Sequence, residues 1–289
     1  MRSLVLGAAG QIGSALVSHL RDQGHAVLEF DLVRSGAEDL RQHGNPRLEE
    51  LMRQCDFVYF LAFDVGGAVY LKKYQMTYEF LSNNVKIMNT TFDMLRAYNK
   101  PFVFASSQMS NMAYSSYGVL KSVGEYYTRI LGGIVSKFWN VYGVEQDATK
   151  AHVITDFVRK AKDGRMVDML TDGTEERQFL FARDASEALL YFGEHYDQIP
   201  RDRELHVTSF EWVSILRVAH LVAGFFEGTT VVPGAQQDGV QRDKRNEPDP
   251  FVLNYWRPRT VLADGIRCVI DAMKGPEQYP TMNHARYRA

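Results

Sequence analysis

The 289-residue sequence lacks the features that mark secreted and membrane proteins. It has only two cysteines, Cys55 and Cys268, which are too few for a disulfide framework and make a reducing compartment the default. No apolar run approaches the roughly 18 residues of a transmembrane helix. The first apolar run ends at Gly7 and is too short for the core of a signal peptide. We therefore expect a cytoplasmic protein without a membrane partner.

An excess of basic residues is also missing. The chain has 33 lysines and arginines against 35 aspartates and glutamates, so we expect no nucleic-acid partner. The histidines form no metal-ligand spacing with the cysteines, which predicts that no metal is bound. Apolar residues make up 45% of the chain and charged residues 24%, and these values exclude a disordered chain, a collagen and a coiled coil.

What the sequence does contain is an alternation of two patterns along its first 140 residues. Short apolar runs, typical of strands, occur at residues 3–6, 26–30, 37–40, 56–62, 101–105 and 134–138. Helical spacing of apolar residues separates them at 11–23, 47–53, 83–98 and 118–131. This alternation predicts an α/β fold, with a doubly wound parallel sheet of the Rossmann type.

The pattern changes after residue 145. Helical spacing occurs at 152–162, 183–191 and 212–226, a further strand is expected at 205–207, and residues 233–258 have the composition of a loop. We expect a Rossmann domain over residues 1–145, to which the chain returns near 178–192 and 203–210. A smaller mixed α/β lobe would take residues 146–177 and 211–275, followed by a tail at 276–289.

Three glycines follow the first expected strand with the spacing Gly-x-x-Gly-x-x-Gly: Gly7, Gly10 and Gly13. Glycines let a backbone turn sharply beside a pyrophosphate, and the following helix offers its unpaired N–H groups. Asp31 comes 18 residues after Gly13, where it can accept hydrogen bonds from an adenosine ribose. Its charge would repel a 2′-phosphate, which favours NAD over NADP, although Arg34 lies nearby. The alternative is a structural glycine turn beside a surface aspartate.

Tyr117 and Lys121 are four residues apart in an expected helix, so both point to one face. A lysine ammonium near a phenol lowers the tyrosine pKa, which suits a general base. Ser106 and Ser107 follow the strand at 101–105, at the sheet edge where ligands bind in such folds. A serine hydroxyl there can hold a reacting oxygen. Taken alone, the tyrosine and lysine could equally be a solvated pair on a helix surface.

In this order, the motifs resemble the extended short-chain dehydrogenase/reductases, specifically their NAD-dependent nucleotide-sugar epimerase/dehydratase group. The resemblance covers the chain to about residue 272 and continues through Asn140-Val141-Tyr142-Gly143, Arg177-Gln178-Phe179 with Asp184, and Trp256-Arg257-Pro258. It implies an NAD-dependent enzyme acting on a UDP-, GDP- or dTDP-linked sugar. It also implies a homodimer formed through the helices at 83–98 and 118–131.

The resemblance gives individual residues a role. Ser107, Tyr117 and Lys121 match the catalytic triad. The matches to NAD contacts are Gly7, Gly10, Gln11, Ile12, Gly13, Asp31, Leu61, Ala62 and Asn84, together with Tyr117 and Lys121. The matches to substrate contacts are Ser107, Gln108, Asn140, Arg177 and Arg242. Asn140 and Arg177 suit a diphosphate, and their plain alternatives are a turn residue and a solvated member of the charge cluster at 175–177.

Two positions after Ser107 narrow the chemistry. Relatives that eliminate water carry Asp and Glu there, whereas this chain has Gln108 and Met109, which cannot transfer a proton in that way. Relatives that decarboxylate need a glutamate near position 109, and those that epimerise C3 and C5 need a cysteine. The remaining chemistry is transient oxidation at C4 with return of the hydride to the other face, so we favour a 4-epimerase.

Several alternatives stay open. Within the family they are a nucleotide-sugar 4-ketoreductase or dehydrogenase, and a dehydratase. From another class, a non-catalytic NAD-binding sensor or scaffold would not need Tyr117 and Lys121. The loop at 64–68 resembles that of GDP-mannose-type 3,5-epimerases, which keeps a GDP-sugar open as substrate. Phe63 and Lys137 depart from the family pattern, in which a small residue and an arginine are common at these positions.

Overall fold

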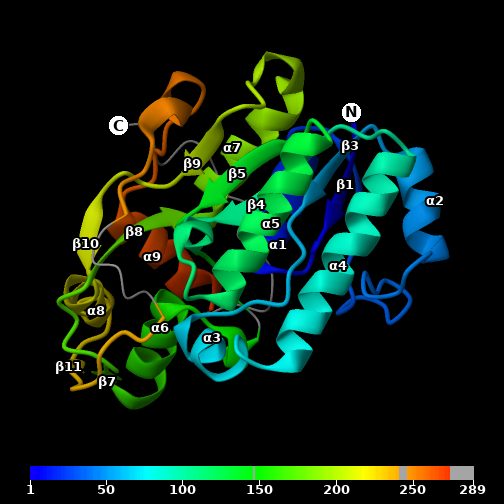
Figure 1. Ribbon diagram of the computed structural model, residues 1–289. Coiled ribbons are helices and arrows are strands. Elements are labelled where there is room, and N and C mark those ends of the chain that lie inside the picture. Colours follow the sequence, from blue (N-terminus) through cyan, green and yellow to red (C-terminus); the bar gives the residue numbers. More distant parts are fainter. Residues whose placement is uncertain (146, 241–245, 274–289) are drawn as a thin grey trace.

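A parallel sheet of six strands forms the centre of the molecule, in the order β2-β1-β3-β4-β5-β9 (Figure 1). The computed structural model describes residues 1–145, 147–240 and 246–273. The strands are β1 (Arg2–Leu6), β2 (Ala26–Phe30), β3 (Phe57–Phe60), β4 (Phe102–Ser107), β5 (Ile134–Phe138) and β9 (Glu204–Val207). The strand order reverses between β1 and β3, which makes their carboxyl ends the expected ligand edge.

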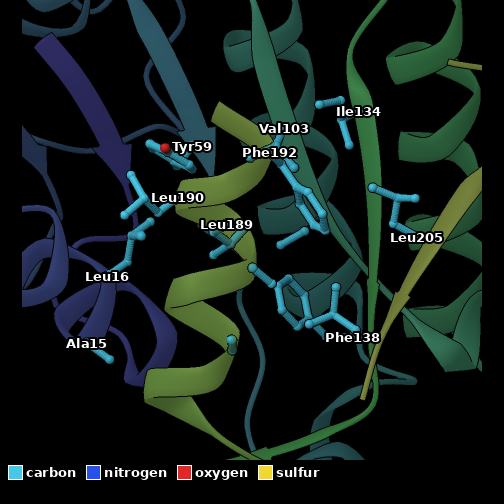
Figure 2. Close-up of a cluster of buried hydrophobic side chains, with 14 of the residues drawn as sticks. Ala15, Leu16, Tyr59, Val103, Ile134, Phe138, Leu189, Leu190, Phe192 and Leu205 are labelled. Carbon is cyan, nitrogen blue, oxygen red and sulfur yellow. The ribbon is translucent and has the colours of Figure 1, made fainter. Parts of the chain in front are cut away.

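Helices cover both faces of this sheet, which confirms the doubly wound α/β fold. They are α1 (Gln11–Asp22), α2 (Pro46–Gln54), α4 (Tyr78–Ala97), α5 (Ser116–Ile130) and α7 (Ala182–Glu194), while α3 (Ala68–Tyr74) lies near the carboxyl edge of the sheet, beside the smaller group of elements (Figure 1). Helices α1 and α7 pack together on one face, where Leu16, Leu189 and Phe192 meet Val103 and Phe138 of the sheet (Figure 2). Helices α2, α4 and α5 contribute to a second hydrophobic cluster with the other face.

A smaller group of strands and helices, which corresponds to the predicted mixed α/β lobe, lies beside the large sheet (Figure 1). Its strands are β6 (Asn140–Tyr142), β8 (Glu176–Phe181) and β10 (Trp212–Ser214) in one sheet, and β7 (Met166–Asp168) and β11 (Thr230–Val232) in another. Its helices α6 (Val153–Gly164), α8 (Ile215–Ala223) and α9 (Leu262–Ala272) surround a third hydrophobic cluster. Short 3₁₀ helices are η1 (Gln108–Asn111), η2 (Ala148–Lys150), η3 (Tyr196–Gln198) and η4 (Pro250–Asn254). Among the described residues, no helix combines the length and apolar character needed to cross a bilayer.

The strand expected at residues 37–40 is wrong, because this segment forms turns. Its backbone N–H and C=O groups form hydrogen bonds with side chains, and not with a neighbouring strand. The Asn45 amide donates to the backbone oxygens of Ala37 and Asp39 at 2.9 and 3.2 Å. The Asp39 carboxylate accepts from the backbone N–H of Arg41 at 2.9 Å. The sheet therefore ends at β2, and no further strand pairs outside it in the described part of the chain.

The helix expected over residues 212–226 is correct only in its middle. Its first three residues form β10, which pairs antiparallel with β8 through Trp212 and Gln178. The Ser214 hydroxyl accepts a hydrogen bond from the backbone N–H of Arg217 at 3.2 Å and so caps α8, which begins at the next residue. A side-chain cap in the middle of an apolar stretch thus separates a strand from a helix.

Candidate active site

The turn between β1 and α1 has no room for side chains at two of its glycines. Gly7 has a φ of +86°, and a Cβ there would lie 2.7 Å from the backbone nitrogen of Ala62. A Cβ on Gly13 would lie 1.9 Å from the backbone oxygen of Gly7. Helix α1 starts at Gly10 without a side-chain cap from the described residues, so its N-terminal end suits an anion. This cradle fits the pyrophosphate of a dinucleotide.

Asp31 lies beside the same turn, just after β2. Its carboxylate accepts hydrogen bonds from the backbone N–H groups of Ala9 and Val33, both at 2.9 Å. Arg34, whose proximity in sequence left NADP open, forms an ion pair with Glu29 at 2.5 Å. An acid is therefore held next to the phosphate-binding turn, while the arginine is bound to another carboxylate, and this arrangement suits an adenosine ribose without a 2′-phosphate.

Leu61 and Ala62 continue β3 toward the glycine turn, and the backbone N–H of Leu61 donates to Leu6 at 3.0 Å. Asn84 of α4 is fully buried behind them. Its amide nitrogen donates to the backbone oxygens of Phe80 and Asp64, and its oxygen accepts from the backbone N–H of Asp64 at 2.7 Å. In this structure Asn84 therefore fixes the loop that follows Ala62.

Ser107 ends β4, and Tyr117 and Lys121 lie on α5, the helix that begins just after η1. The three side chains are 9%, 8% and 3% exposed. Helix α5 packs unusually close to its neighbours, because a Cβ on Gly118 would lie 2.1 Å from the backbone oxygen of Met109. The glycine that follows Tyr117 thus lets the start of α5 contact the turn after Ser107.

Burial dominates the electrostatics of this site. It raises the pKa of Tyr117 to about 12, although the nearby Ser107 side chain opposes the shift. Burial also lowers the pKa of Lys121 to about 7, against the opposing charge of Glu125. The sequence predicted that Lys121 would lower the tyrosine pKa, but in the structure that pKa is raised. The reason is desolvation of the phenolate, together with the commitment of the Lys121 ammonium to the backbone oxygen of Ala105 at 2.6 Å.

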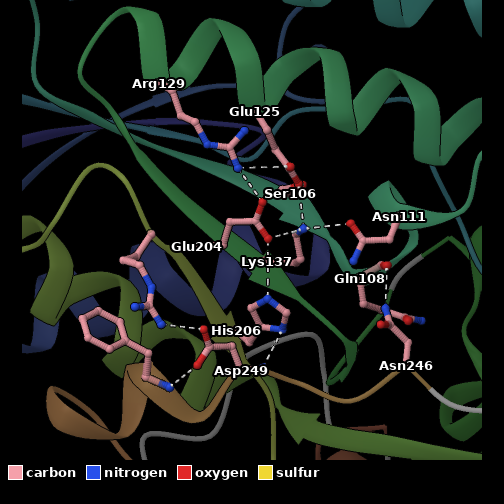
Figure 3. A network of polar contacts seen from close by, with 12 residues as sticks. Ser106, Gln108, Asn111, Glu125, Arg129, Lys137, Glu204, His206, Asn246 and Asp249 are labelled. Atoms are coloured by element: carbon pink, nitrogen blue, oxygen red, sulfur yellow. Dashed lines mark hydrogen bonds and ion pairs between the residues drawn. The ribbon is translucent and has the colours of Figure 1, made fainter.

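A charged network behind the site holds α5 against the sheet (Figure 3). Glu125, one helical turn after Lys121, accepts a hydrogen bond from the Ser106 hydroxyl. The fully buried Lys137 of β5 lies 3.4 Å from Glu125 and 2.5 Å from Glu204 of β9. Sequence reasoning missed Glu125, although its spacing of four residues from Lys121 places it on the same side of the helix.

The residues expected to meet substrate lie on two sides of this centre. Asn140 begins β6, and its side-chain oxygen is buried without a hydrogen-bond partner among the described residues. A buried polar atom of this kind is expected to bond a ligand. Gln108 is buried in η1, and its backbone oxygen accepts from the Asn246 amide at 3.2 Å. With its amide oriented to match its neighbours, Gln11 bridges the backbone of Val141 and Gly143 at 3.2 and 3.1 Å.

Arg177 lies on β8, whose Phe179 pairs with Asn140 of β6. Its guanidinium is not a solvated member of a charge cluster, since the side chain is 9% exposed and forms an ion pair with Asp238 at 2.5 Å. No motif or spacing in the sequence indicated this partner. Arg242 lies outside the described residues. No group of three or more candidate metal ligands occurs in the described part of the chain, and the absence of a metal stays a prediction.

Comparison with known proteins places this site in a family. A sequence model of the NAD dependent epimerase/dehydratase family matches residues 3–207. The chain belongs to this family. The match contains the glycine turn, Asp31, the serine, tyrosine and lysine, and Arg177, and it ends with β9. Membership confirms the expectation of an NAD-dependent enzyme of the extended short-chain dehydrogenase/reductase type.

Individual members of the epimerase/dehydratase family resemble the chain along nearly all of its length. GDP-L-fucose synthase of Sinorhizobium fredii is 25% identical over 300 residues, which cover 92% of this chain and 93% of the relative. UDP-glucose 4-epimerase of Mycolicibacterium smegmatis is 27% identical over 325 residues, covering 96% and 100%. Among solved structures, an epimerase of Methanothermobacter thermautotrophicus has a TM-score of 0.81 at 18% identity, covering 94% and 92%. The names of the two sequence relatives contain nucleotide-linked sugars and describe different reactions.

Proposed function

We propose that this enzyme interconverts the C4 epimers of a nucleotide-linked hexose. The observation that carries the proposal is the composition of the buried site at the end of β4. Ser107, Tyr117 and Lys121 are present, and the next two residues, the buried Gln108 and Met109, carry no group that titrates. An elimination that needs a further acid and base has neither at these positions, whereas oxidation of a hydroxyl and its reversal need only the triad and a hydride carrier.

In this proposal the triad handles the proton and the oxygen of the C4 hydroxyl. Tyr117, as the phenolate, would take the proton of that hydroxyl as the C4–H bond gives up its electron pair, and as the phenol it would return the proton in the reverse step. Because burial favours the phenol, the positive charges of Lys121 and of bound NAD are assigned the role of favouring the phenolate. NAD, when bound, accepts the hydride and gives it back. Ser107, whose side chain favours the Tyr117 phenolate, is assigned the role of holding the same oxygen. The sugar presents its opposite face for the return, which inverts C4.

The substrate side of the proposal rests on Asn140 and Arg177. The unpartnered oxygen of Asn140 and the guanidinium of Arg177 lie on paired strands of the smaller sheet. An arginine fork suits a diphosphate, and we assign Arg177 that role. The likeness to UDP-glucose 4-epimerase supports a UDP-hexose, and the likeness to GDP-L-fucose synthase supports a GDP-hexose, so both are tested together with a dTDP-hexose.

We also propose the domain division, assembly and location expected from the sequence. Residues 1–145, with α7 and β9, would bind NAD, and the smaller elements would select the sugar nucleotide. Exposed apolar side chains on α4 and α5 support a homodimer. Two free cysteines, Cys55 and Cys268, are compatible with a reducing cytoplasm.

The test is an interconversion assay with purified enzyme and NAD. UDP-glucose, a GDP-hexose and a dTDP-hexose are supplied separately, and the hexoses released by hydrolysis are separated by chromatography. We expect one of them to yield its C4 epimer without net consumption of NAD or NADH. Tyr117→Phe should lower the rate by about 10²- to 10⁴-fold. Tyr114→Phe is the control. It removes the hydroxyl of a half-exposed tyrosine that donates a hydrogen bond to the Met112 sulfur, and it should leave the rate unchanged.

Other outcomes separate the alternatives. Net oxidation of NADH with a 4-keto sugar nucleotide, and no epimerisation, would identify a ketoreductase. Release of water from the substrate would identify a dehydratase. Binding of NAD without turnover of any nucleotide sugar would favour the sensor or scaffold.

A further inference from the structure

A short segment, residues 236–240, connects the substrate side of the molecule with the catalytic side, and we call it the 236–240 strap. Its first residue, Gln236, accepts a hydrogen bond from the Lys72 ammonium of α3 at 3.1 Å. Its last residue, Val240, is 5% exposed and belongs to the hydrophobic cluster that contains Met109 and Tyr117. The backbone N–H of Gln236 also donates to the backbone oxygen of Leu170, in the smaller part of the molecule, at 2.9 Å. The strap is therefore held at its first end by α3 and Leu170, and at its last end by the hydrophobic cluster of the catalytic side.

The middle of the strap is held by Arg177. The Arg177 guanidinium donates to the backbone oxygen of Glu176 at 2.7 Å and to the Asp238 carboxylate at 2.5 Å. The same carboxylate accepts from the backbone N–H of Val240 at 2.8 Å, which ties the turn of the strap to the ion pair. The arginine side chain is 9% exposed and that of Asp238 is 23% exposed, so the ion pair has little contact with solvent.

We propose that Asp238 occupies the place on Arg177 that a substrate diphosphate takes, and that nucleotide binding displaces the 236–240 strap. A carboxylate and a phosphate present similar anionic oxygens to an arginine fork. The N–H groups of the guanidinium that are bonded to Asp238 are unavailable to a phosphate oxygen, so the two anions compete. The inference rests on the proposed function only through the assignment of Arg177 to a diphosphate.

The competition sets the affinity for the nucleotide. A ligand that binds only the strap-displaced form has its affinity reduced by the fraction of molecules in which that form is populated. Removing the charge of Asp238 while keeping its shape should raise that fraction. Asp238 is thus inferred to be a residue that weakens substrate binding, in contrast to the residues of the glycine turn and the triad.

The experiment measures binding of UDP, GDP and dTDP to the NAD-saturated enzyme by titration calorimetry. Asp238→Asn is expected to bind the preferred diphosphate about three- to tenfold more tightly than the unchanged enzyme. Asp156→Asn is the matched control, because Asp156 pairs with Lys160 on the exposed side of α6 and its loss changes the net charge equally. The control should bind as the unchanged enzyme does, and NAD affinity should stay constant in both variants.

A second measurement uses the unchanged enzyme, so that the test does not depend on the variant folding. Saturation with the diphosphate should increase amide hydrogen exchange in a peptide that contains residues 236–240, since the N–H of Val240 loses the Asp238 carboxylate. Ligand contact alone would decrease that exchange. Weaker or unchanged binding by Asp238→Asn, decreased exchange, or no binding of any diphosphate would overturn the inference. Failure of C4 epimerisation with these binding results intact would overturn only the proposed function.

Discussion

The ammonium nitrogen of Lys121 lies 3.8 Å from the centroid of the Phe63 ring and 4.9 Å from that of Phe104. The Phe63 ring also meets the Tyr117 ring edge-on, with centroids 5.8 Å apart. Lys121 is therefore enclosed by aromatic rings, and its one hydrogen bond to a described residue runs to the backbone oxygen of Ala105. Phe63 helps to remove the ammonium from water.

This enclosure predicts that Lys121→Met stabilises the cofactor-free protein near neutral pH. Below about pH 7 both the folded and the unfolded chain carry the charge, so folding bears the full desolvation of the ammonium. As pH rises from about 7 toward 10.5, only the unfolded chain still binds the proton, and the disadvantage of the folded state shrinks. The gain in free energy of unfolding should be about 1–3 kcal/mol near neutral pH and should fall toward zero in alkali.

Urea unfolding near neutral pH and near pH 10 checks this pH dependence. Lys86→Met, on an exposed position of α4, is the control and should change stability little at either pH. An equal gain at both pH values, or a loss at both, would show that the buried charge is not the cause. Catalytic activity should be lost in Lys121→Met throughout, since the proposed triad is incomplete.

The glycine turn predicts a loss of NAD binding in Gly13→Ala. The added Cβ would meet the backbone oxygen of Gly7 at 1.9 Å, a distance that only a shift of the turn or of α1 relieves. We expect NAD affinity, measured by calorimetry, to fall more than about tenfold, with destabilisation of roughly 1–3 kcal/mol. Gly36→Ala is the control, because a Cβ there meets no described atom within 4 Å. Equal behaviour of the two variants would argue against the turn as the dinucleotide site.

The sequence could predict the features that depend on local pattern. Alternating apolar runs and helical spacing located all six strands of the large sheet, and Gly7, Gly13 and Asp31 fall together because they flank consecutive strands. The failure at residues 37–40 has the opposite cause. The pattern of apolar residues in this segment resembles that of a strand. Only the structure shows that the Asn45 side chain, and not a neighbouring strand, hydrogen-bonds the backbone oxygens of Ala37 and Asp39.

Contacts between distant residues could not be predicted in the same way. The motif gave Tyr117 and Lys121, but the pKa of each depends on burial that Phe63 and the rest of the site impose. Arg177 was named from the motif, while its partner Asp238 lies 61 positions away in a segment without periodicity. A single sequence carries no signal for such a pair.

Exposed apolar side chains on α4 and α5 predict that the enzyme is a homodimer in solution. These helices pack against each other, and their outer side carries Tyr78, Leu81, Val85, Val119, Val123, Tyr126, Tyr127 and Ile130. An apolar patch of this kind on neighbouring helices is typical of a protein interface. Val123→Arg should shift the mass measured by light scattering from dimer to monomer. Val261→Arg, at an exposed valine before α9, should leave the mass unchanged, and a monomeric unchanged enzyme would contradict the prediction.

The charged network behind the site predicts that Lys137→Met strongly lowers the free energy of unfolding. Lys137 is fully buried between Glu125 and Glu204, and its removal leaves Glu125 with Arg129, and Glu204 with Arg129 and His206 (Figure 3). Breaking a buried pair in this way costs roughly 3–5 kcal/mol. Arg203→Met, which breaks an exposed pair with Asp249, is the control and should cost less than about 1 kcal/mol.

The pH dependence of Lys137→Met separates a lost ion pair from lost packing. His206 first, and then Lys137 and Arg129, hold the pKa of Glu204 well below its usual value of 4.5. A carboxylate with a lowered pKa contributes stability above that usual value, and the contribution is lost as the pH falls toward the pKa of the folded state. Without Lys137 the pKa of Glu204 moves back up, so the variant has less of this stability to lose in acid. The difference in free energy of unfolding between the two proteins should therefore be large at neutral pH and should shrink as the pH falls from the usual value of 4.5 toward the lowered pKa of folded Glu204. A difference that stays constant throughout that pH range would mean that Lys137 acts by filling space, because a packing defect does not titrate.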